Sequence, residues 1–116
     1  ACKYINIKPG RVGGLSNAIA IHNLAKENGI PVWVGGMLES AVGASICVDL
    51  ATLDNFTYPG DLFPSSRFYK QDLGVPPLDI TPRNTFVPFG MNRPQPDPDA
   101  LARQTVQYKS VVPLAS

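Results

Sequence analysis

The sequence predicts an α/β fold in which short parallel strands alternate with helices. Within the first 73 residues, brief runs of apolar and β-branched residues recur, and helix-like apolar patterns lie between them. A helix that returns the chain to begin another strand in the same direction is typical of a parallel sheet. The remainder differs, because most of the 12 prolines lie after position 75 and residues 74–100 are turn-rich and extended.

The first predicted strand spans residues 3–8 and places Ile5 and Ile7 on one face. A glycine-rich turn follows it. Residues 15–28 then predict a helix, because apolar residues recur there at a spacing close to 3.6. Gly29 comes directly after this pattern and is a candidate for the helix C-cap.

The second predicted strand spans residues 30–34, and its unbroken apolar run indicates burial on both faces. Ser40 is a candidate N-cap for a second helix that continues to about Leu53. Residues 56–58 predict a third short strand. A proline–glycine turn then leads to a short helical or irregular stretch over residues 65–69.

The tail of the chain predicts two further elements, a short helix over residues 98–103 and a closing strand over residues 105–109. Three parallel strands make an incomplete sheet, and the chain has too few helices to cover both faces of one. The sequence therefore predicts either a small open α/β unit or a piece of a larger barrel.

Composition excludes several classes of partner. The chain has 116 residues and a net charge of +1, without a basic stripe for nucleic acid or an apolar run long enough for a membrane span. The N-terminus does not read as a signal peptide. Cys2 and Cys47 are too few for a disulfide framework, and no CxxC motif suggests a metal site. We expect reduced thiols in a cytoplasmic protein.

Lys8 ends the first predicted strand, at the edge where α/β proteins hold catalytic groups. The strand would fix the root of its side chain, and its amine could serve as a general base. Taken alone, a strand-end lysine is more often solvated. Two other polar residues have plainer interpretations: Arg11 as a loop arginine that pairs with a neighbouring element, and His22 as a satisfied core histidine.

The loops after the second and third strands hold five candidate substrate-binding residues: Gly35, Gly36, Met37, Glu39 and Asp61. Glycines let a ligand approach the backbone, and a methionine adapts its shape to varied acyl groups. The alternative for this segment is a turn with a gap-filling methionine. Glu39 would contact the substrate or the lysine, or instead favour the helix N-terminus by its charge. Asp61 would orient active-site groups or cap the following turn.

Three motifs occur in order along the chain: IxIKPGRVGGL, GIPVWxGGMLES and NFxxPGDxxxSSRxxKxD. Together they resemble the C-terminal part of the enolase superfamily and, within it, the o-succinylbenzoate synthase and N-acylamino acid racemase group. The resemblance is close over residues 1–73 and looser over the tail. The GGMLE signature argues against the muconate cycloisomerases and dipeptide epimerases of the same superfamily.

This resemblance implies the C-terminal portion of a modified (β/α)₇β barrel of the TIM type. Residues 3–8, 31–34 and 56–58 would be its strands six, seven and eight. Residues 1–73 would form this section of the barrel, and residues 74–116 an extended proline-rich tail that packs on the barrel or on a separate capping domain.

The resemblance also implies a Mg²⁺-dependent reaction in which a proton is abstracted next to a carboxylate. Lys8 matches the catalytic lysine of the sixth strand. It would exchange the proton in racemisation, or hold the enediolate electrostatically in the synthase reaction of menaquinone synthesis. The metal-ligating carboxylates and a second lysine come from earlier strands of the family barrel, outside this chain. We therefore expect the isolated chain to be inactive.

The implied partners are the rest of the barrel, the capping domain, a small carboxylate substrate and further copies of the protein. Residues 43–51 depart from the family pattern, since they replace its Arg, His and Asn, and the tail lacks a Gly-rich turn. The rival hypothesis is a non-catalytic α/β fragment that acts as a binding or assembly module.

Overall fold

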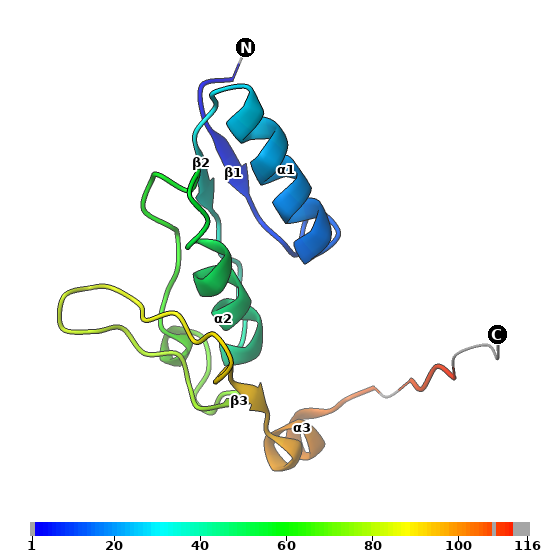
Figure 1. Cartoon of the computed structure of the whole chain (residues 1–116). Coiled ribbons are helices and arrows are strands. Elements are labelled where there is room, and N and C mark those ends of the chain that lie inside the picture. Colours follow the sequence, from blue (N-terminus) through cyan, green and yellow to red (C-terminus); the bar gives the residue numbers. More distant parts are fainter. Residues whose placement is uncertain (1, 108, 113–116) are drawn as a thin grey trace.

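The computed structural model describes residues 2–107 and 109–112. Its elements follow in order as β1 (Ile5–Ile7), α1 (Leu15–Glu27), β2 (Val32–Val34), α2 (Ala41–Leu50), the 3₁₀ helix η1 (Ser65–Arg67), β3 (Gly74–Val75), β4 (Gln95–Pro96) and α3 (Pro98–Gln104). Figure 1 shows α1 beside the β1–β2 pair, whereas the segment after α3 runs away from the rest of the chain. In the described residues no helix is both long and apolar enough to span a bilayer.

β1 and β2 pair in parallel, with Ile5 opposite Val32 and Ile7 opposite Val34. The ladder continues one step further, because the Gly35 amide donates to the Ile7 carbonyl at 2.9 Å. The predicted parallel strand–helix–strand order is therefore confirmed. Both strands are shorter than predicted.

The third predicted strand, at residues 56–58, does not form as a continuous strand. Two isolated parallel bridges replace it, Val32 with Phe56 and Gly35 with Asp61. The proline after residue 58 has no N–H group to donate, so the ladder is interrupted between the two bridges. The predicted parallel direction of this segment is confirmed, but the prediction of a regular strand was wrong.

Glycine conformation sets both ends of α1. Gly13 and Gly14 have φ angles of +87° and +109°, which favour glycine and allow the tight turn out of β1. At the other end Gly29 has φ +66°, and the Ile30 amide donates to the Ala25 carbonyl at 2.9 Å. The C-cap is Asn28, and Gly29, the predicted candidate, lies one position beyond it in the αL conformation.

The N-terminus of α2 is capped by a residue far along the chain. Ser40 occupies the N-cap position as predicted, and its carbonyl accepts from the Ala44 amide at 2.9 Å, but its side chain makes no capping hydrogen bond. Instead the Asp72 carboxylate accepts from the Ala41 amide at 2.9 and 3.1 Å, and also from the Gly74 amide at 2.9 Å. α2 ends at Leu50, three residues before the predicted end, where turn hydrogen bonds take over.

The apolar core lies on two sides of α2. One cluster joins α2 to α1 and the β1–β2 pair, and its buried members are Ile7, Ala18, Ala25, Val32, Val34, Cys47 and Leu50. The other joins α2 to the proline-rich tail through Ala41, Ala44, Val48 and Leu78. α2 is therefore a central element, covered by the sheet on one side and by the tail on the other.

The tail is attached to α2 by a carboxylate as well as by apolar contacts. Asp49, only 15% exposed, accepts from the Phe89 amide at 2.9 Å and from Arg93 Nε at 2.8 Å. Nearby, the short β3–β4 ribbon is antiparallel. These contacts hold residues 86–93 against the outer surface of the helix.

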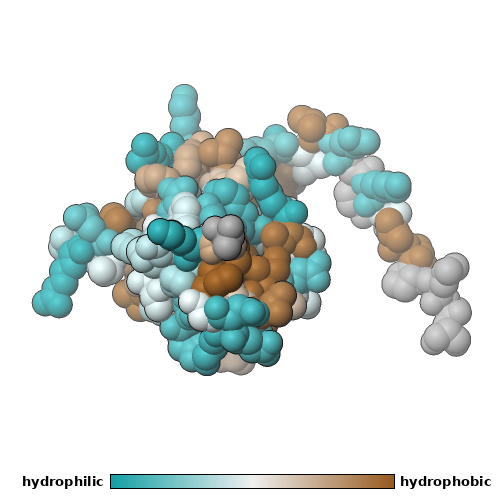
Figure 2. Space-filling model, turned by 90° about the horizontal axis from the view of Figure 1, so that it is seen from above, coloured by the Kyte–Doolittle hydropathy of each residue, from teal (hydrophilic) through white to brown (hydrophobic). Residues whose placement is uncertain are grey.

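The end of the described chain contains one predicted element and lacks another. The predicted helix at residues 98–103 is confirmed as α3, and Asp97 caps it by accepting from two amides. Residues 105–107 and Lys109 form no strand, and residue 108 lies outside the described residues. The two sheets of the described chain contain two strands each and include no partner for this segment. Val106, in this segment, is fully exposed. Figure 2 shows hydrophobic residues on the part of the chain that extends away from the main body.

Candidate active site

The candidate active site lies at the carboxyl ends of β1 and β2. Lys8 follows β1 directly and is half-buried. Its Nζ donates to the carbonyl of Gly36 at 2.8 Å. This hydrogen bond ties the end of β1 to the loop after β2 and fixes the lysine amine at the edge that the sequence predicted.

Gly35 lies beneath the Lys8 side chain. A Cβ atom at this position would lie 2.7 Å from Lys8 Nζ and would also collide with Asn6 Oδ1. Asn6 and Lys8 share a face of β1, because side chains alternate along a strand. Asn6 was not among the predicted site residues, although its position two residues before Lys8 indicated that it lies on the same face.

Gly36 and Asp61 approach each other closely through their backbones. The Gly36 amide donates to the Asp61 carbonyl at 2.8 Å, and the Asp61 amide donates to the Val34 carbonyl at 2.9 Å. A Cβ atom on Gly36 would collide with the Asp61 carbonyl oxygen. Both predicted residues are thus brought together, and the glycine is required by this close approach.

The loop between β2 and α2 is held by side chains on two sides. Glu39 Oε2 accepts from the Met37 amide at 2.7 Å, and the Tyr69 hydroxyl donates to the Leu38 carbonyl at 2.8 Å. Among the described residues Glu39 makes no ion pair with Lys8. The Glu39 carboxylate therefore shapes the loop, an outcome that the sequence analysis did not consider.

A pocket of about 330 Å³ adjoins this loop, and its lining includes predicted and unpredicted residues: Gly36, Met37, Leu38, Asp61, Phe63, Arg67 and Phe68. The Arg67 guanidinium lies 4.3 Å from the centre of the Phe63 ring, and Phe68 packs edge-on against the same ring. The pocket shares Gly36 with the Lys8 hydrogen bond.

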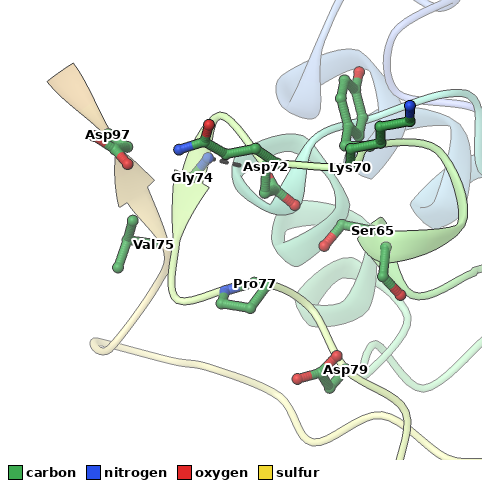
Figure 3. A pocket seen from close by; sticks show the side chains of 11 residues that line it. Ser65, Lys70, Asp72, Gly74, Val75, Pro77, Asp79 and Asp97 are labelled. Atoms are coloured by element: carbon green, nitrogen blue, oxygen red, sulfur yellow. Dashed lines mark hydrogen bonds between the residues drawn. The ribbon is translucent and has the colours of Figure 1, made fainter. Parts of the chain in front are cut away.

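A second pocket, of about 370 Å³, lies between η1 and β3 and is drawn in Figure 3. Asp72 and Asp97 both line it, but their carboxylates already accept hydrogen bonds at the N-termini of α2 and α3. Ser65, also in the lining, is buried and bonded to Leu78. Three polar side chains of this pocket are therefore already engaged in hydrogen bonds that stabilise the fold.

Cys47 is a buried thiol on α2 and is free, as is the exposed Cys2. Burial raises the pKa of the Cys47 thiol to about 11, and the negative charge of Glu39 adds to this effect while Lys8 opposes it. Cys47 is therefore protonated at neutral pH and unsuited to nucleophilic chemistry.

His22 has the structural role that the sequence favoured. It is buried, its Nε2 accepts from the Asn55 amide at 3.1 Å, and its ring stacks on Phe56. Arg11 was predicted to pair with a neighbouring element. It is exposed and forms no ion pair within the described part of the chain, so its pairing stays a prediction.

The metal ion implied by the resemblance is not matched by a site in this chain. Within residues 2–107 and 109–112 no three His, Cys, Asp or Glu side chains lie close enough together to hold an ion. The residues present therefore do not fit a complete divalent-metal site.

Parallel strands joined by a helix, with a lysine and a glycine-rich loop at their carboxyl ends, define an α/β protein whose candidate site lies at the edge where such proteins hold catalytic groups. Comparison with known proteins identifies the family. The chain belongs to the family described as enolase C-terminal domain-like, whose pattern matches residues 1–89.

Named relatives lie within the expected group. The chain is 49% identical over 87 residues to an o-succinylbenzoate synthase of Bacillus subtilis, covering 75% of the chain and 23% of that protein. It is 51% identical over 76 residues to an N-succinylamino acid racemase of Amycolatopsis, covering 66% of the chain and 21% of that protein. The chain thus spans about a quarter of the length of the relatives it matches.

A solved structure of an enolase-superfamily protein from Listeria innocua is similar in fold. It superposes with a TM-score of 0.74 at 34% identity, over 88% of this chain and 28% of that one. The similarity therefore extends beyond the segment matched by the family and includes part of the tail.

Proposed function

We propose that this chain supplies part of the catalytic face of an enzyme that abstracts a proton next to a carboxylate. The proposed activity is that of an o-succinylbenzoate synthase, an N-acylamino acid racemase, or both. The observation that carries the proposal is the Lys8 amine, held by the Gly36 carbonyl above a glycine that leaves room for it. The named relatives support the choice of reaction.

In this proposal the Lys8 amine acts on the carbon next to the carboxylate. In racemisation it takes or returns the proton on one face of that carbon. In the synthase reaction its positive charge lies next to the enediolate and stabilises it. The hydrogen bond to Gly36 fixes the amine, so little reorganisation is needed when charge develops.

The five loop residues shape the substrate side of this site. Gly35 and Gly36 leave space for Lys8 and for the approach of a ligand to the backbone. Met37 lines the pocket that would receive the acyl group, Glu39 holds its loop, and Asp61 borders the pocket. We propose all five as substrate-binding or site-forming residues.

A divalent ion, Mg²⁺ in the family that the motifs resemble, is proposed as the cofactor with ligands outside this chain. The remainder of the barrel and the capping domain would supply those ligands, and further copies of the protein would complete a homo-oligomer. The 116-residue chain alone is then expected to be inactive. We propose a cytoplasmic location, as the reduced thiols suggested.

A second candidate is a non-catalytic α/β unit that serves in assembly. The observation that favours it is the absence of a three-ligand metal cluster from the described residues. The two candidates differ in whether the complete protein catalyses proton exchange.

The test is exchange of the α-proton of an N-acylamino acid in deuterated water, followed by NMR in the complete enzyme. Lys8→Ala should lower the exchange rate by about 10²–10⁴-fold, the usual contribution of a general base. Lys3→Ala removes an exposed lysine before β1 and is the matched control. Exchange that persists in Lys8→Ala would remove Lys8 from the mechanism, and a complete protein without exchange would favour the assembly unit.

A further inference from the structure

The loop that follows β2 carries the carbonyl to which Lys8 is bound. Three of its backbone groups are satisfied close to the site. The Gly36 amide donates to Asp61, the Gly36 carbonyl accepts from Lys8, and the Met37 amide donates to Glu39. The Leu38 carbonyl is held from a different part of the chain. It accepts at 2.8 Å from the hydroxyl of Tyr69, 31 residues further along the sequence.

The backbone of Tyr69 is hydrogen-bonded to a buried turn. Its amide donates to the Ser65 carbonyl at 3.1 Å, in the turn that ends η1. Ser65 is 1% exposed and is bonded in both directions to Leu78, which accepts from the Ser65 amide at 3.1 Å and donates to Ser65 Oγ at 3.0 Å. The Tyr69 hydroxyl is therefore a fixed donor presented to a loop of adjustable backbone.

We infer that Tyr69 is a positioning residue for Lys8, acting through the Leu38 and Gly36 carbonyls. Gly36 has no side chain to restrict its backbone, so its carbonyl direction depends on contacts of the residues around it. Tyr69 holds the backbone two residues further on. The Gly36 carbonyl consequently keeps the orientation that retains the Lys8 amine. The effect of this contact on catalysis rests on the function proposed above.

Tyr69→Phe tests the inference, because it removes one hydroxyl and keeps the ring. The first readout is the rate at which trinitrobenzenesulfonate modifies Lys8 in the purified complete enzyme, measured by peptide mass spectrometry relative to Lys3. We expect Lys8 to react about fivefold faster in the variant, which is the ratio that corresponds to one ordinary hydrogen bond. The second readout is α-proton exchange, in which kcat should fall while KM stays unchanged.

Tyr58→Phe is the matched control. The Tyr58 ring packs edge-on against that of Tyr4, which precedes β1, whereas Lys8 follows the opposite end of that strand. It should change neither readout. A thermal unfolding curve of each variant verifies that the comparison is made between folded proteins.

The outcomes separate this inference from the proposed function. Lys8 that reacts at the parent rate in Tyr69→Phe would overturn the positioning role, even if the parent enzyme exchanges protons. A fivefold change in Lys8 reactivity in a protein that exchanges no protons would support the positioning role and overturn the proposed function. A rise in KM alone, with Lys8 modified at the parent rate, would also overturn the inference.

Discussion

The Gly35 position illustrates how a single missing side chain can matter more for activity than for stability. An alanine methyl there would meet Asn6 Oδ1 and both the Nζ and the Cγ atoms of Lys8, so the two side chains must shift. We expect Gly35→Ala to lower the thermal midpoint only slightly, because neither side chain is fully buried. Activity should fall on the order of 100-fold, because a displacement of about 1 Å at a reacting group has that effect.

Gly10→Ala is the matched control for this change. A Cβ atom at Gly10 would have no neighbour within 4 Å. Its activity should remain at the parent level. Steady-state kinetics and thermal unfolding of the two variants would check the prediction, and equal activity in both would show that Lys8 does not depend on the space above Gly35.

The two cysteines should differ sharply in reactivity. Because the pKa of buried Cys47 is raised to about 11, its reactive thiolate is scarce at pH 8 in the folded protein. Cys2 is exposed. We expect a thiol reagent at pH 8 to label Cys2 in the native state and to label Cys47 only after denaturant is added. Rapid labelling of both would show that Cys47 is accessible in the folded state.

At the residue scale the sequence predicted those groups whose chemistry depends on a motif. Lys8 and Gly35 lie together as their motifs indicated. Tyr69 could not be predicted in this way, because its role depends on a contact between residues 31 positions apart. The position of Asn6 beside Lys8 was predictable from the alternation of side chains along the strand. An asparagine two residues before a lysine does not by itself indicate a functional site.

Among the elements, the cap of α2 gives the clearest prediction. Asp72→Ala removes the acceptor for the Ala41 and Gly74 amides and should lower the free energy of unfolding by about 0.5–2 kcal/mol, the usual effect of losing a helix cap. Ser40→Ala should cost much less, since its side chain does not cap the helix. Urea unfolding of both variants measures the difference, and a larger effect at Ser40 would contradict the structure.

The Lys26–Asp54 contact connects the end of α1 to the segment before Phe56. The hydrogen bond from Lys26 lowers the pKa of the Asp54 carboxyl below its ordinary value of 3.8. A carboxyl whose pKa is lower in the folded state stabilises the fold above its unfolded pKa. The contribution should be fully present above that value and disappear as the pH falls through the folded pKa.

Asp54→Asn tests this dependence. The parent should be the more stable protein at neutral pH, and the difference should shrink as the pH falls below 3.8. Both residues are well exposed, so we expect the difference to be small and to decrease with added salt. Denaturant unfolding at a series of pH values measures it. A difference independent of pH would argue against a role for the carboxylate charge.

At the element scale the sequence predicted what local periodicity determines. Both long helices and the first two strands occur where apolar spacing placed them. The strand at residues 56–58 was only partly predictable, because its pairing depends on which backbone groups face β2. The cap of α2 was not predictable, since a nearby serine was a plausible local choice and the carboxylate that accepts from the helix amide, that of Asp72, lies in another part of the chain.

For the whole molecule, the relevant feature is an aromatic surface on the β1–β2 face. Tyr4, Trp33, Tyr58 and Pro59 line a pocket of about 300 Å³, and the two tyrosines are about half exposed. In the barrel proposed above, this face would be turned inward and covered by the other strands. Trp33 is the one tryptophan of the sequence and therefore reports on that event.

We expect the fluorescence of Trp33 to change when the remainder of the barrel is present. In the isolated chain acrylamide should quench it readily. In the complete enzyme the emission should shift to shorter wavelength and quenching should decrease, because the indole leaves water. Identical emission in the two proteins would show that the aromatic surface is not covered by the barrel.

Asp49 accepts hydrogen bonds from the Phe89 amide and from the Arg93 side chain, which makes two distant stretches of sequence interdependent. A chimaera that receives only the tail of a relative would leave this nearly enclosed carboxylate without its donors, whereas one that receives α2 and tail together would keep a matched pair. Recombination between related enzymes should therefore succeed most often when both segments come from the same parent.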